Sequence, residues 1–207
     1  MKLITLKAVV IAVAALGTAY VTWRCLSRRS KTSMTEKLKE HLIRCEKAMQ
    51  SAKPILGKFS FPTDSRTLTV IGFISWLIEH QESILLLITH GNAGSASALL
   101  RPVVEGAYRA LWINLPATEA EVQKFNEKDR IELEFGDIAT ALDTAYGMGN
   151  FFQDFKARAW KHLNSYAHGG MHQIGRRFLD NEVAYVAPEV MLRSSVGGGN
   201  HAAVWRC

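Results

Sequence analysis

LTVIGFISWLIEHQESILLLITH, residues 68–90, is the segment that decides the fold, because it is both long and very apolar. Asp64 precedes it and is typical of a helix N-cap, while Gly91 is typical of the position just past a helix end. Polar residues at 79–82 interrupt the apolar run in its middle, where a membrane span would stay apolar. The segment therefore predicts one long helix buried in the core of an all-α protein.

Shorter helical patterns follow, so the sequence predicts a bundle of about six helices. Two capping boxes, SMTE at residues 33–36 and TEAE at residues 118–121, each place Ser or Thr three residues before Glu. Pro102 lies inside the third helix and predicts a kink or a short first segment. No segment shows sustained polar–apolar alternation, so no sheet is expected. The expected helices are 33 to about 53, 64–90, 94–115, a short helix from 118, 130–146, 151–167 and a last short helix at 171–179.

Residues 1–33 account for the whole net charge of +6, because they contain six Lys and Arg and no acidic residue. The rest of the chain is balanced. A balanced body lacks the extended basic area that binding to a phosphate backbone needs, so we expect no broad nucleic-acid surface.

Residues 3–23 predict a single transmembrane helix. The segment is 21 residues long, is interrupted only by Lys7, and would span about 30 Å as a helix. Tyr20 and Trp23 lie at its end, where aromatic belts occur, and four basic residues follow, which favours a cytoplasmic C-terminal side. We therefore expect a membrane anchor at 1–33, and the cytoplasmic remainder divides into a helical domain at 34–180 and a poorly ordered tail at 181–207.

Two alternatives to this anchor stay open. The first is a cleaved signal peptide with its cleavage site near residues 17–19. The second is translation from Met34, which would give a cytoplasmic protein. Cys25, Cys45 and Cys207 lack the spacing of metal ligands and indicate a reducing compartment.

Arg101, Glu105 and Arg109 form a column on the helix expected at 94–115. Because they are four residues apart, they share one side of the helix over about 12 Å. Tyr108 shares that side, as does Trp112, and neither is typical of a purely solvated face. The column is therefore either a solvated, ion-paired face or a covered groove whose guanidinium groups hold a phosphate or carboxylate.

The stretch NSYAHGG, residues 164–170, ends the helix expected at 151–167. A glycine pair is an ordinary helix stop, and a histidine there gains from the helix dipole. The functional alternative is that the glycines allow close approach of a ligand and present two histidines to the Arg101 column, since histidine is the natural acid–base group near neutral pH. The candidate binding residues in this region are Lys161, Asn164, His168 and His172.

A helical zinc pair is a third interpretation, because His168 and His172 are four residues apart and Glu105 would supply a third ligand. The glycine pair between the histidines argues against one continuous helix, so no metal is expected. The chain has no P-loop, dinucleotide fingerprint or nucleophile elbow, and no cofactor is expected.

RPVVE at residues 101–105 and NSYAHGG at residues 164–170 resemble the paired motifs of an uncharacterised family of bacterial all-helical proteins. The resemblance covers roughly residues 36–180 and implies the fold without an activity. The layout is also similar, more distantly, to HEPN-type domains, many of which are ribonucleases of toxin–antitoxin and phage-defence systems. Their signature places Arg before His with four to six residues between them. This chain departs from it, since those positions before His168 hold Lys161, His162 and Leu163, and the nearest upstream arginine is Arg158.

Two functional hypotheses follow. In the first, Arg101, Glu105 and His168 form an anion site that binds or cleaves a phosphodiester of RNA or a nucleotide in bacterial stress or defence. His168 would be the general acid or base, Arg101 and Arg109 would stabilise the developing charge, and Glu105 would orient them. In the second, the same residues form a polar lock between helices of a non-catalytic interaction module. A second copy of the chain is a further candidate partner.

Overall fold

The structure is a computed structural model that describes residues 43–44, 46–47, 50, 62–90, 92–179 and 182–183. The helices of these residues form an all-α bundle, as the sequence predicts. The predicted anchor at 3–23, the capping box at 33–36, the three cysteines and the tail from residue 184 onward lie outside the described residues.

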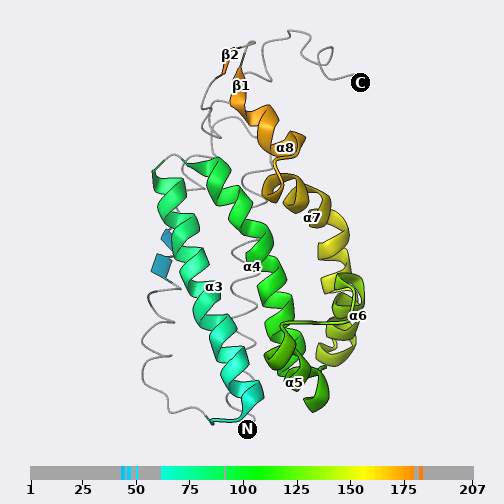
Figure 1. Cartoon of the computed structure of the whole chain (residues 1–207). Coiled ribbons are helices and arrows are strands. Elements are labelled where there is room, and N and C mark those ends of the chain that lie inside the picture. The colour runs from blue at the N-terminus through cyan, green and yellow to red at the C-terminus, as the bar shows by residue number, and fades with distance from the viewer. Residues whose placement is uncertain are drawn as a thin grey trace.

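The two longest helices, α3 (Ser65–Thr89) and α4 (Ala93–Asn114), lie side by side and antiparallel (Figure 1). Asp64 caps α3 as predicted, because its carboxylate accepts a hydrogen bond from the Thr67 N–H at 2.9 Å. Of the described helices, α3 is long and apolar enough to cross a membrane, a criterion that core helices of soluble proteins also meet. Its buried residues are Val70, Ile74, Leu77, Ile78, Gln81 and Ile84.

α3 and α4 approach each other closely at Gly106. A Cβ atom added there would lie 2.3 Å from Cζ3 of Trp76, so only glycine leaves room for the indole. Trp76 also packs on His80 of its own helix, with 4.1 Å between ring centroids. The long apolar helix is therefore held against the backbone of α4.

α4 continues through Pro102 without interruption, so the predicted short first segment does not form. Proline removes one backbone donor from a helix interior, which is costly in isolation. Here the next residues, Val103 and Val104, are buried in the core at 0% and 1% exposure. Tertiary packing on both sides of α4 therefore outweighs the local penalty.

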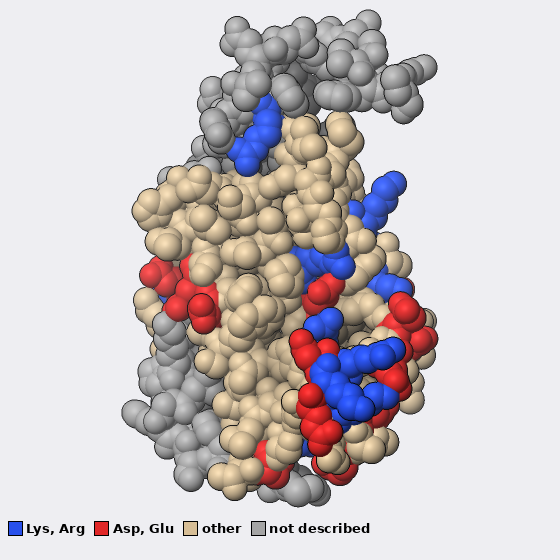
Figure 2. Space-filling view, viewed as in Figure 1, with Lys and Arg blue, Asp and Glu red and all other residues tan. Residues whose placement is uncertain are grey.

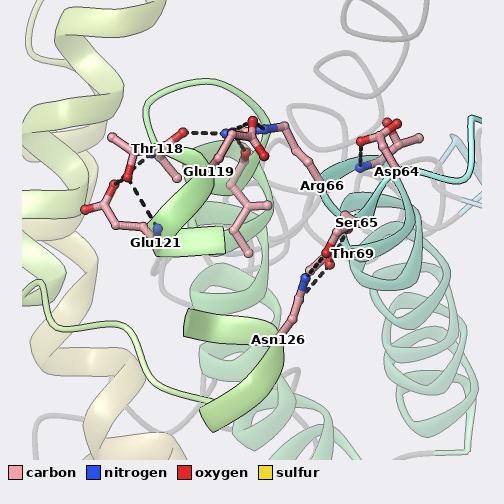
Figure 3. Close-up of polar contacts among 11 residues, drawn as sticks. Asp64, Ser65, Arg66, Thr69, Thr118, Glu119, Glu121 and Asn126 are labelled. Carbon is pink, nitrogen blue, oxygen red and sulfur yellow. Dashed lines mark hydrogen bonds and ion pairs between the residues drawn. The ribbon is translucent and has the colours of Figure 1, made fainter. Parts of the chain in front are cut away.

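α5 (Glu119–Lys128) begins at the predicted capping box. The Glu121 N–H donates to the Thr118 hydroxyl at 3.3 Å, and the Thr118 N–H donates to the Glu121 carboxylate at 2.7 Å. Arg66, in the first turn of α3, forms an ion pair with Glu119 at 2.7 Å (Figure 3). This link joins the starts of α3 and α5. The same guanidinium donates to the backbone carbonyls of Ile113 and Ala117.

α6 (Phe135–Tyr146) begins later than the sequence predicts. The expected start at Arg130 is wrong, because Asp129 ends α5 in the left-handed conformation with φ of 47°. This conformation turns the chain away from the helix axis. The following residues connect α5 to α6, and Glu132 among them forms an ion pair with Lys124 of α5.

α7 (Phe151–Ala167) has the predicted bounds, but the helix expected at 171–179 is shorter. It is replaced by α8 (Met171–Ile174) and a 3-10 turn (Gly175–Arg177). The expectation of no sheet is also corrected. Strands of two residues are too short to show alternation, so the sequence pattern does not reveal them. The strands are β1 (Phe178–Leu179) and β2 (Glu182–Val183), which pair antiparallel.

α4 is the central helix of the bundle. α3 packs on one side of it and α7 on the other, and α6 packs against both α4 and α7 (Figure 1). The helices that carry RPVVE and NSYAHGG are therefore neighbours, although the two motifs are far apart in sequence.

Candidate functional site between helices α4 and α7

Arg101 reaches from α4 to the C-terminal end of α7. Its Nε donates to Glu105 Oε1 at 2.8 Å, one turn further along α4. Its Nη1 is in hydrogen-bond contact with His168 Nε2. Its guanidinium carbon lies 5.2 Å from the centre of the Trp160 ring. The structure therefore brings together the three residues that the sequence suggested for chemistry: Arg101, Glu105 and His168.

The cluster is partly open to solvent. The side chains of Arg101 and Glu105 are 23% and 24% exposed, and His168 is an exposed residue. A guanidinium group has donors and no acceptor, so the imidazole is the accepting partner when the two side chains form a hydrogen bond. The arrangement is a pre-positioned cation beside an imidazole at the surface.

A row of aromatic rings supports Arg101 from the core. Trp160 stacks on Phe135 at 4.1 Å, and Phe135 stacks on Tyr108 at 4.7 Å between centroids. Tyr108 and Trp112 are 0% and 3% exposed, so this part of the column is a covered seam. The contact of the guanidinium with the Trp160 ring adds a cation–π interaction to this support.

Sequence reasoning did not single out Trp160 and so missed its position beneath Arg101. The available signal was spacing, because Trp160, Asn164 and His168 are four residues apart and so form one row on α7. Asn164 lies in the middle of that row. Its Oδ1 is buried and accepts no hydrogen bond within the described part of the chain.

His172 packs against residues of α7 other than those of the Arg101 cluster. Its ring lies 4.4 Å from that of His162 and 6.2 Å from that of Tyr166, and its N–H donates to Ser165 Oγ at 3.0 Å. The expectation that the glycines present both histidines to the Arg101 column therefore holds for His168 alone.

The glycine pair is required by the backbone of the turn. Gly169 adopts φ of 66°, which residues with a Cβ rarely adopt. A Cβ atom on Gly170 would lie 2.5 Å from Ser165 Oγ. The close approach that the sequence suggested is thus between Gly170 and the preceding helix of the same chain.

Two further predicted residues, Arg109 and Lys161, are exposed. No contact joins either of them to Arg101 or His168 among the residues that the structure describes. Over the same residues, no group of three His, Cys, Asp or Glu is placed to hold a metal ion. His168 and His172 do not share a helix, since α7 ends before the glycine pair and α8 begins after it. On the face shown in Figure 2, Lys and Arg mix with Asp and Glu mainly at the lower right, and large areas carry none of these side chains.

The fold and this cluster define a class: an all-α bundle protein with an Arg–Glu pair and an exposed histidine at the seam of its central helix. The chain belongs to a family of unknown function, DUF6988, whose model matches residues 74–201. The match includes every residue of the Arg101 cluster. No curated protein and no solved structure matches the chain.

Proposed function

We propose that this protein binds a phosphate-containing ligand where Arg101 of α4 meets His168 of α7. The contact between these two side chains is the observation that carries the proposal. A phosphate group has several acceptor oxygens, so it can replace that contact by accepting from the guanidinium and from a protonated or reoriented imidazole at once.

The surroundings of Arg101 favour binding because they hold the guanidinium in place before a ligand arrives. Glu105 accepts a hydrogen bond from Nε and does not use the two Nη groups of Arg101. Trp160 supports one face of the guanidinium. Pre-positioned donors lose less conformational freedom on binding. The partial exposure of Arg101 leaves it accessible to a small anion.

Phosphodiester cleavage is the reaction that this arrangement would serve. His168 would move a proton, Arg101 would stabilise the charge that develops on the phosphate oxygens, and Glu105 would orient Arg101. The distant resemblance to HEPN-type domains supports an RNA or nucleotide substrate in bacterial stress or defence. The absence of an arginine at the signature positions before His168 weighs against it.

The test is a titration of the full-length protein with nucleotides and RNA, followed by calorimetry and by product analysis. R101A and H168A should each weaken binding by about tenfold or more, since each removes a charge-assisted hydrogen bond. R158A is the matched control, because it removes an exposed arginine of α7 that lies outside the cluster. If R101A and H168A both bound nucleotides and RNA with wild-type affinity, the site would be ruled out.

A polar lock between α4 and α7 is the second candidate. It is favoured by the observation that Nε and Nη1 of Arg101 already have protein partners. In that case H168A would lower the free energy of unfolding while any nucleotide binding stayed intact. Thermal unfolding and calorimetry on the same variant separate the two functions.

We also propose that residues 3–23 anchor the protein in a membrane with the helical domain on the cytoplasmic side. The apolar length of that segment and the basic residues that follow it support this location.

A further inference from the structure

We infer that Asn164 selects ligands that carry a hydrogen-bond donor, such as a hydroxyl group, beside their phosphate. This inference rests on the proposed phosphate site and names the class of ligand that the site accepts. It starts from the buried Oδ1 atom of Asn164, which accepts no hydrogen bond among the described residues.

The position of Asn164 follows from the contacts of its neighbours. Trp160 and His168 lie one turn before and one turn after it on the same row of α7. Arg101 contacts both, since its guanidinium lies over the Trp160 ring and its Nη1 contacts His168. Asn164 lies along α7 between the residues that make these two contacts, so we place it in the phosphate site.

The protein groups of the site leave the Asn164 oxygen unsatisfied. Arg101 directs Nε to Glu105 and Nη1 to His168. A buried acceptor without a donor is unfavourable, and such atoms in native proteins normally find a protein, water or ligand partner. A phosphate dianion brings only acceptors and cannot serve. A hydroxyl or amine group on the carbon next to the one that bears the phosphate ester can donate a hydrogen bond to the Asn164 oxygen.

The experiment compares three matched phosphates on the full-length protein by calorimetry: ethyl phosphate, 2-hydroxyethyl phosphate and 2-methoxyethyl phosphate. The hydroxyl compound has the donor, the methoxy compound has an acceptor without a donor, and the ethyl compound has neither. We expect the hydroxyl compound to bind about tenfold more tightly than the other two, as one well-placed hydrogen bond allows. In N164L, which keeps the branched shape of the side chain and removes the amide, all three should bind alike.

Equal affinities in the wild-type protein would overturn the inference while leaving the phosphate site in place. Tighter binding of the methoxy compound would also overturn it, because the amide nitrogen would then face the ligand. Failure of all three compounds to bind would refute the phosphate site itself, and the inference with it. If N164L does not fold, N164A removes the same oxygen, and a preference that persists in the folded variant counts against Asn164.

Discussion

Tyr108 illustrates at the residue scale how burial makes stability depend on pH. Its hydroxyl donates to the Phe152 carbonyl at 2.8 Å inside the core. Burial raises the pKa of Tyr108 far above its ordinary value, and the nearby Asp143 carboxylate adds to the rise. Because the folded pKa exceeds the unfolded value of about 10, the stabilisation is present below that pH and is lost as the pH rises above it.

We therefore predict that the free energy of unfolding falls as the pH is raised from about 9 to about 11, and that it falls less in Y108F. At neutral pH, Y108F should cost about 1 kcal/mol for the lost hydrogen bond. Denaturant unfolding at a series of pH values measures both effects. An identical pH dependence in the two proteins would show that other groups control alkaline unfolding.

Arg101 makes contacts that a lysine cannot reproduce. Its Nε and Nη1 reach different partners in a fixed fork, while a lysine ammonium is a single point of charge. R101K should therefore weaken phosphate binding nearly as much as R101A, by about tenfold or more. The nucleotide titration measures this. If R101K bound nucleotides as tightly as the wild-type protein, a positive charge alone would suffice for binding.

At the scale of elements, the packing of α3 on α4 depends on which glycines face the partner helix. G106A should destabilise the protein by about 1–3 kcal/mol, because its methyl group would collide with the Trp76 ring. G72A is the matched control within α3, where an added Cβ meets nothing within 4 Å. It should stabilise the protein by up to about 1 kcal/mol through helix propensity. Thermal unfolding of the two variants gives the comparison, and equal effects would contradict it.

The start of α7 depends on a buried carboxylate from α6. Asp143 is 5% exposed, and its two oxygens accept from the Phe152 and Gln153 N–H groups at 2.9 and 3.1 Å. These donors would otherwise be unpaired in the first turn of the helix. D143A should cost about 1–3 kcal/mol in chemical denaturation. A loss below about 0.5 kcal/mol would show that other groups cap the helix.

At the scale of the whole molecule, the proposed anchor at residues 3–23 would decide where the site works. Full-length protein should sediment with membranes and resist extraction by salt, because a span of this length is held by apolar burial. A version that starts at Met34 should remain in the supernatant. Fractionation of both, with a mass measurement of the N-terminus, makes the comparison. Intact full-length protein in the soluble fraction would contradict the anchor.

Local signals in the sequence located most helices. Asp64 and the Thr118 capping box mark helix starts because a cap is made by residues within one turn. α7 matches its predicted bounds because its glycine pair ends the helix locally. The start of α6 was missed because the left-handed conformation of Asp129 has no strong sequence mark.

The sequence by itself determined an all-α protein with RPVVE and NSYAHGG on two helices, since apolar period and capping depend on neighbouring residues. Only the tertiary structure decided that Arg101 meets His168, that Trp160 supports the guanidinium, and that His172 turns to His162 instead. These pairings join residues of different helices. They depend on how α4, α7 and α8 pack, and the spacing within one helix carries no information about that packing.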